Sequence, residues 1–86
     1  MRKQETRQFA RELGFKLRVM REFMSLSKSD ASKKFDISPS MVSKYESGQN
    51  VPNLMYLSAI VKATGMKLDD LLIDGQAFVK KLYKIQ

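Results

Sequence analysis

Three short polar or cationic side chains recur on the outer face of one short expected helix: Ser40, Ser43 and Lys44. This helix begins at Pro39, directly after Ser38, which can cap it. Hydroxyl and ammonium groups donate hydrogen bonds, and a hydroxyl also accepts them. A polar helix that a small core holds clear of the body can enter the major groove of DNA, where base edges present donors and acceptors. The chemistry that these residues indicate is therefore hydrogen bonding to nucleic acid.

The chain lacks two residue types that often carry out catalysis, because it contains no Cys and no His. Their absence removes disulfides, thiolate nucleophiles, soft metal sites and imidazole bases. The hydroxyl nucleophiles that remain have no His to activate them. We therefore expect no enzymatic activity, no metal and no cofactor.

The chain is basic, with sixteen Lys and Arg against nine Asp and Glu and a net charge of +7, and most of the basic residues precede Ser47. A basic N-terminal half suits a polyanionic partner, although the charge alone fits a solvated helix surface equally well. The 86 residues suffice for one small domain. No segment has the length of a signal-peptide core or a membrane span, so we expect a soluble, cytoplasmic protein.

Apolar periodicity predicts a long first helix over residues 4–23. Apolar residues recur in steps of four, four, three and four at Phe9, Leu13, Leu17, Met20 and Met24. A second apolar stripe on the same helix contains Phe15, Val19 and Phe23. Gly14 lies inside the helix, where glycine costs about 1 kcal/mol relative to alanine.

Capping residues predict two short helices after the first. Ser27 followed three residues later by Asp30 resembles a capping box, which starts a second helix over residues 28–35. The third helix, which carries the polar face, covers residues 39–47. Gly48 can adopt the left-handed backbone that ends it.

Two further helices complete the predicted domain. Asn53 can cap a fourth helix that ends before Gly65, and residues 68–73 form a short fifth helix. Asp74 and Gly75 then break the pattern.

Residues 75–86 form an extension beyond the domain that we expect over residues 1–74. The apolar residues Phe78, Leu82 and Ile85 are spaced four and three apart, as on one face of a helix. Alternation is also present, at Phe78, Lys80, Leu82 and Lys84, so a strand fits as well. Either this extension or a second subunit is expected to cover the second apolar stripe of the first helix.

Residues 27–48 resemble the helix-turn-helix of the phage-repressor class, the Cro/cI-type or XRE family. Similar segments lie on both sides: the Leu13-Gly14 pair with the later Arg21, and the run from Val42 to Gly48 with Pro52 after it. The apolar residues of the fourth and fifth helices also match, so the resemblance covers roughly residues 9–73. It implies an all-α, five-helix, lambda-repressor-like fold.

The resemblance also implies a set of DNA contacts. The residues that correspond to base-reading positions are Pro39, Ser40, Ser43 and Lys44. Those that correspond to phosphate-binding positions are Arg21, Ser27, Lys28, Ser38, Ser47, Gln49 and Asn50. Lys44 can contact either a base or a phosphate, and Ser38 can be only a cap. Arg21 and Glu46 match a family ion pair that ties the first helix to the end of the third.

The function that the resemblance implies is that of a sequence-specific regulator of transcription. We expect a repressor that binds the major groove of double-stranded DNA, at an inverted-repeat operator, as a homodimer built from the fifth helix and the tail. The alternative is an antitoxin-like or other protein-binding module of the same fold, which neutralises a partner protein.

Overall fold

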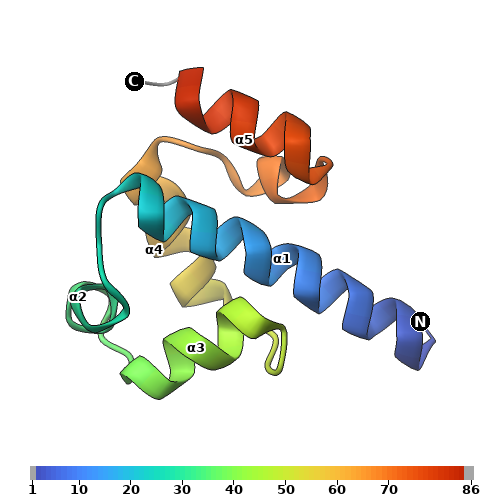
Figure 1. Cartoon of the computed structure of the whole chain (residues 1–86), viewed down its shortest axis with the longest axis horizontal. Helices are drawn as coiled ribbons and strands as arrows, with labels where there is room; N and C mark the ends of the chain where they lie inside the picture. Colours follow the sequence, from blue (N-terminus) through green and yellow to red (C-terminus); the bar gives the residue numbers. More distant parts are fainter. Residues whose placement is uncertain (1, 85–86) are drawn as a thin grey trace.

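The computed structural model describes residues 2–84, and it is helical throughout this range apart from the connections. The elements are α1 (Lys3–Phe23), α2 (Lys28–Phe35), α3 (Pro39–Ser47), α4 (Leu54–Thr64), a 3-10 helix η1 (Leu68–Leu72) and α5 (Gly75–Lys84) (Figure 1). The predicted limits of α2 and α3 are confirmed, and α1 begins one residue earlier than expected. Within residues 2–84, no helix has the length and apolar character that a membrane span requires.

The long helix α1 lies between α3 on one side and α5 on the other (Figure 1). Three residues of its predicted apolar face are buried, namely Leu13, Leu17 and Met20, whereas Phe9 is 39% exposed and Met24 is half-buried. α4 and η1 close the same core with Ile60 and Leu71. One core therefore holds α3 against α1 and leaves the outer face of α3 outside it.

Local capping explains why α2 and α3 begin and end where they do. The backbone nitrogen of Asp30 donates to Ser27 Oγ over 2.9 Å, and the Ser27 nitrogen donates back to the Asp30 carboxylate over 3.0 Å. These bonds, led by the one from the Ser27 backbone, lower the pKa of Asp30. Asp36 ends α2 in the left-handed region with a φ of 57°, and Gly48 ends α3 with a φ of 81°. Asp36 thus sets the turn between α2 and α3, and Gly48 sets the end of α3, because both residue types tolerate this conformation.

Gly14 permits the close approach of α1 to α3. A Cβ atom at this position would lie 2.5 Å from the backbone oxygen of Glu46 and 2.6 Å from that of Tyr45. Both atoms belong to the backbone of α3, so they cannot move aside as the end of a flexible side chain would. The cost of glycine in the helix is therefore offset by the packing of α3.

Replacing Gly14 with alanine is expected to lower the free energy of unfolding by about 1–3 kcal/mol, the range for overpacked sites. Helix propensity alone predicts the opposite sign, a gain of about 1 kcal/mol. Gly75→Ala is the matched control, because a Cβ there lies 3.4 Å from the ring of Phe15, at the edge of ordinary contact. Urea unfolding of both variants measures the difference, and a stabilised Gly14→Ala protein would refute the close-packing account.

The C-terminal tail is a helix, α5, rather than a strand. Phe78 and Leu82 have no exposed surface and belong to the core that contains Leu17. The ring of Tyr83 meets the ring of Phe23 edge-on, with 5.2 Å between centroids. The tail therefore packs on α1 of its own chain; Ile85, which was predicted to join it, lies outside the described residues.

Two sequence expectations near the tail need correction. The short fifth helix, expected over residues 68–73, is a 3-10 helix that ends at Leu72. Asp74 does not simply break the pattern, because its carboxylate accepts hydrogen bonds from the backbone nitrogens of Gln76 and Ala77 at 3.0 and 3.2 Å. Asp74 therefore starts α5.

A buried lysine ties the end of η1 to α1. Lys16 is 5% exposed, and its Nζ donates to the carbonyl oxygen of Leu71 over 2.7 Å and to that of Ile73. Burial lowers the pKa of Lys16. A second link joins Asp70 to Lys81 of α5 over 2.6 Å, and this bond lowers the pKa of Asp70. These links hold η1 against α1 and α5. We expect residues 75–86 to be an extension beyond a domain over residues 1–74, and we interpret α5 as a segment that packs on this domain.

Candidate nucleic-acid interface

The helix α3 has one face anchored in the core and one face open. Val42 is fully buried and Tyr45 is 4% exposed. On the other side, Pro39 and Ser40 are exposed, whereas Ser43 and Lys44 are half-buried. The four predicted base-reading residues therefore lie on the part of α3 that faces away from the core, and the two at its start are the more accessible.

An aromatic cluster behind α3 holds its inner face in place. The ring of Tyr56 lies 5.2 Å from that of Tyr45 and 5.7 Å from that of Phe35. Burial raises the pKa of Tyr56 to about 12, and its hydroxyl has no hydrogen-bond partner among the described residues. The orientation of α3 thus depends on packing against α2 and α4.

A polar groove runs beside α3, where α1, the start of α2 and the end of α3 meet. The residues that line it are Arg18, Arg21, Glu22, Lys28, Ser43, Glu46 and Ser47. It gathers four of the predicted DNA contacts, which come from three different helices. Its lining carries three basic side chains, two hydroxyls and two carboxylates; Glu22 pairs with Arg18 and Glu46 with Arg21. Lys28 and the hydroxyls are the groups that suit an anion here.

Arg18 belongs to this groove, although the sequence reasoning did not select it. Its Nε lies 3.5 Å from a carboxylate oxygen of Glu22 one turn later, and both side chains are more than half exposed. An exposed pair of this kind contributes little to stability. The signal that could have found Arg18 is its spacing, since it lies three residues before Arg21 on the same face of α1.

The remaining predicted phosphate contacts lie around the ends of α2 and α3. Ser38 caps α3, because its Oγ accepts from the backbone nitrogen of Met41 over 3.1 Å. Ser27 caps α2 and remains exposed. Gln49 and Asn50 follow α3; the Asn50 backbone nitrogen donates to the carbonyl oxygen of Lys44 over 3.1 Å. Gln49 does not line the groove and lies instead in a separate hollow near the first half of α1.

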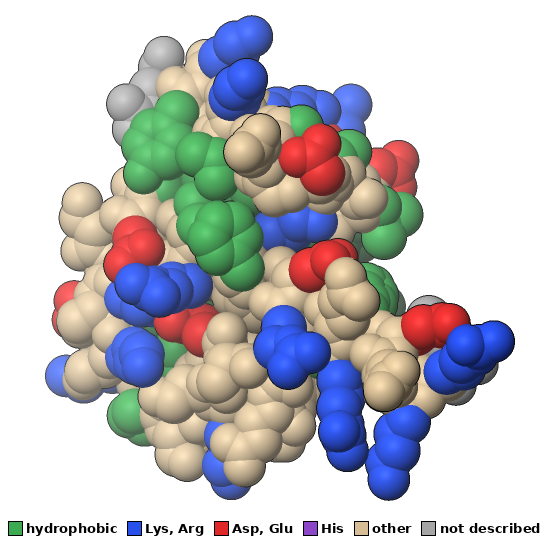
Figure 2. Space-filling model, turned by 45° about the vertical axis from the view of Figure 1, so that its right-hand side comes forward, with side chains coloured by type: hydrophobic (Ala, Val, Ile, Leu, Met, Phe, Trp, Pro, Cys, Tyr) green, Lys and Arg blue, Asp and Glu red, His purple; other side chains and the backbone are tan. Residues whose placement is uncertain are grey.

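Basic side chains dominate the projecting N-terminal end of α1, at the lower right of Figure 2. This end of the helix is exposed from residue 2 to residue 9. The predicted concentration of positive charge in the first half of the chain is thus displayed on the surface.

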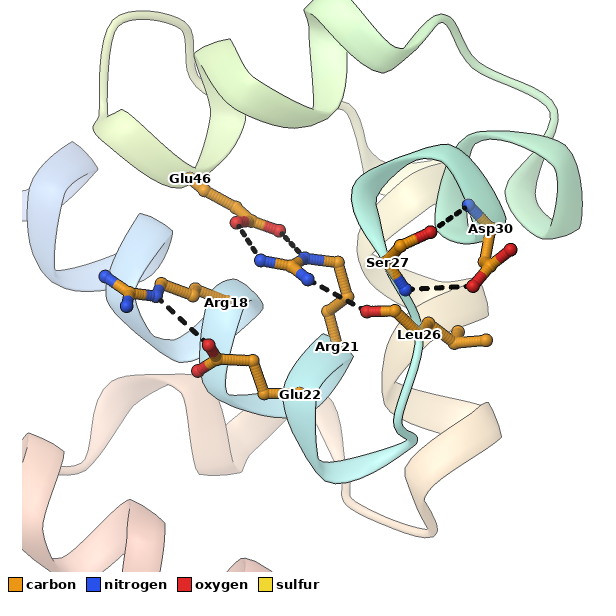
Figure 3. Close-up of polar contacts among 7 residues, drawn as sticks. All are labelled: Arg18, Arg21, Glu22, Leu26, Ser27, Asp30 and Glu46. Carbon is orange, nitrogen blue, oxygen red and sulfur yellow. Dashed lines mark hydrogen bonds and ion pairs between the residues drawn. The ribbon is translucent and has the colours of Figure 1, made fainter.

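The ion pair between Arg21 and Glu46 joins α1 to the end of α3 (Figure 3). Arg21 Nε donates to one carboxylate oxygen over 2.7 Å, and Nη2 donates to the other over 3.0 Å. Nη1 donates to the carbonyl oxygen of Leu26 over 2.8 Å. The hydrogen bonds to Glu46 raise the pKa of Arg21, so the guanidinium stays charged. The predicted pairing is confirmed, and contact of Arg21 with phosphate remains a prediction.

Comparison with known proteins agrees with this geometry. The helix-turn-helix family model matches residues 17–71, from the middle of α1 to η1. No curated protein and no solved structure matches the chain. The matched segment is more than half of the chain and contains α2, the turn, α3 and the groove beside them. The chain therefore belongs to the Cro/cI-type, or XRE, helix-turn-helix family of DNA-binding, transcription-regulator-like proteins.

Proposed function

We propose that this protein is a sequence-specific regulator that inserts α3 into the major groove of double-stranded DNA. The observation that supports the proposal is that α3 has a buried apolar face and an open polar face, which lies beside the polar groove. In this role Pro39, Ser40, Ser43 and Lys44 face the base edges. Serine hydroxyls discriminate weakly, and lysine reaches the acceptors of guanine.

The phosphate contacts of this proposal surround α3. Arg21, Lys28 and Ser47 line the groove, and the remaining ones lie at the neighbouring helix ends: Ser27, Ser38, Gln49 and Asn50. Arg21 donates three of its five N–H groups to Glu46 and Leu26. The other two N–H groups can donate to a phosphate oxygen of DNA. Such contacts fix the register of the protein on the duplex without reading sequence.

Lys28→Ala and Lys44→Ala are expected to weaken DNA binding in different ways. Loss of Lys28 should lower affinity similarly for every sequence, because a phosphate is the same at every base pair. Loss of Lys44 should cost about 1–3 kcal/mol on the preferred site and relax the preference at one base pair. Competition binding with a preferred duplex and its single-base variants measures both. Equal losses on preferred and random DNA for both variants would show that Lys44 contacts only phosphate.

We also propose that the protein binds as a homodimer on an inverted repeat. Several apolar residues that suggested an interface at η1 and α5 are covered by the chain itself, since Leu71, Phe78 and Leu82 are buried. Leu68, Leu72 and Tyr83 stay exposed, at 44%, 75% and 51%, and these large apolar side chains support the interface. A two-fold axis there would set two α3 helices about one DNA turn apart, roughly 34–36 Å. Light scattering on the protein and on its DNA complex measures the stoichiometry.

In this proposal the protein represses transcription by occupying its operator, in the cytoplasm.

The alternative, an antitoxin-like module, shares the fold but would need a partner protein on a surface away from α3. The two functions can be distinguished with a variant altered at Ser43 and Lys44. If the protein is an antitoxin-like module, this variant loses DNA binding and still neutralises the partner protein fully.

A further inference from the structure

We propose that Lys3, Arg7 and Arg11 form a second DNA-backbone contact, which extends the bound half-site beyond the groove that α3 reads. The inference rests on the proposed function and adds a contact that lies outside the polar groove. Its basis is a row of basic residues on the projecting end of α1, next to the end of α3.

Helical phase places this row on the side of α1 that faces α3. Lys3, Arg7 and Arg11 follow one another at intervals of four residues, and Gly14, Arg18 and Arg21 continue the row at intervals of three and four. Gly14 approaches the backbone of Glu46 in α3, and Arg21 donates to the Glu46 side chain. This surface of α1 therefore packs on α3, and the basic row extends the same surface beyond the core.

Close contact between α1 and the end of α3 fixes the position of Arg11. A Cβ atom on Gly48 would lie 2.8–2.9 Å from Cγ, Cα and N of Arg11, so the two backbones meet there. Arg7 and Arg11 line one hollow together with Ser47, Gly48 and Gln49. Two residues predicted to bind phosphate therefore share a concave surface with two arginines.

The charges of this row are uncompensated by the protein. Neither Arg7 nor Arg11 joins an ion pair within residues 2–84, whereas Arg2 lies 3.9 Å from Glu5 and Arg18 pairs with Glu22. Like charges four residues apart on a helix repel each other by a few tenths of a kcal/mol. A polyanion removes this repulsion, and Figure 2 shows the basic side chains standing clear of the surface on this end of α1.

A DNA strand fits the row better than an acidic protein does. Lys3 and Arg11 lie eight residues apart, which is about 12 Å along the helix axis. That length corresponds to roughly three to four base pairs at 3.4 Å each along one strand. Because Arg7 and Arg11 share a hollow with Ser47 and Gln49, a strand that contacts the end of α3 can continue along α1.

The test compares the double variant R7Q/R11Q with a control of equal charge, K33Q/K62Q. Glutamine keeps most of the side-chain stem, which matters because Arg11 packs on Gly48. Lys33 in α2 and Lys62 in α4 are exposed, and they belong neither to the predicted DNA contacts nor to the dimer interface proposed at η1 and α5. Salt titrations of DNA affinity should show a slope smaller by about 2 per bound protomer for R7Q/R11Q. For each bound protomer, the loss of affinity between 50 and 200 mM salt should then be about tenfold smaller for R7Q/R11Q than for the unaltered protein, with no such change in the control.

Flanking DNA provides the second arm of the experiment. Shortening the duplex to the last base pair that α3 reads should weaken binding by the unaltered protein more than binding by R7Q/R11Q, which keeps only Lys3 of the row. The preferred base sequence should stay the same for all variants, so failure of this proposal is distinct from failure of α3 recognition. Equal salt slopes and equal flank dependence for the variant and the unaltered protein would overturn the proposal, and would leave an acidic protein as the partner of the row. If the double variant unfolds, R7Q alone, on the exposed end of α1, should show half the change in slope.

Discussion

The affinity of this protein for duplex DNA is expected to fall by about 10³- to 10⁵-fold when the salt concentration rises from 50 to 200 mM. This range applies to a protein that neutralises about six to ten phosphates, because each contact releases condensed counterions. A dimer in which each protomer uses the groove beside α3 and the ends of α2 and α3 supplies that number. Fluorescence anisotropy at several salt concentrations measures the slope of log affinity against log salt.

The control for this titration is the protein's own stability over the same salt range. Unfolding curves recorded at 50 and 200 mM salt should nearly coincide, since the buried Arg21–Glu46 pair is screened weakly. Affinity that stays flat over the range would mean that phosphate neutralisation contributes nothing, and the interface assigned here would be wrong.

Arg21→Ala is expected to lower the free energy of unfolding by about 3–5 kcal/mol, the cost of leaving one member of a buried ion pair uncompensated. The side chains of Arg21 and Glu46 are only 10% and 5% exposed, so the Glu46 carboxylate left behind has little access to water. The double variant with Glu46→Ala should be less destabilised than the sum of the two single variants. DNA binding should fall as well, because the pair holds the end of α3 against α1.

The exposed pair of Arg18 and Glu22 is the internal control for this cycle. Its side chains are 61% and 51% exposed, and a coupling of 0–1 kcal/mol is ordinary for such pairs. Thermal and denaturant unfolding of the two sets of variants measures both couplings. An additive cycle at Arg21 and Glu46 would contradict the buried pairing.

The sequence predicted α2 and α3 correctly because their limits depend on local chemistry. Ser27, Asp30 and Ser38 make capping bonds within three residues, and Asp36 and Gly48 adopt the left-handed backbone themselves. Interactions of this kind are visible in a short stretch of chain. The Arg21–Glu46 pair was found from the family resemblance, since its members lie 25 residues apart.

Long-range packing decided the features that the sequence left open or missed. Lys16 binds the carbonyl oxygens at the end of η1 from more than fifty residues away, and no local pattern announces it. The tail fitted both a helix and a strand until its packing on α1 selected the helix. The place of Arg18 in the polar groove was not predicted, because this groove forms only where three helices meet.

The most direct test of the central claim is selection of bound fragments from genomic DNA, followed by sequencing. One enriched motif is expected, with two inverted half-sites about one helical turn apart. A Ser43→Ala/Lys44→Ala variant with an unchanged unfolding midpoint is expected to lose that motif and to keep salt-dependent binding to random DNA. Fragments without any shared motif, or the same motif enriched by the unaltered protein and by this variant, would contradict sequence reading by α3.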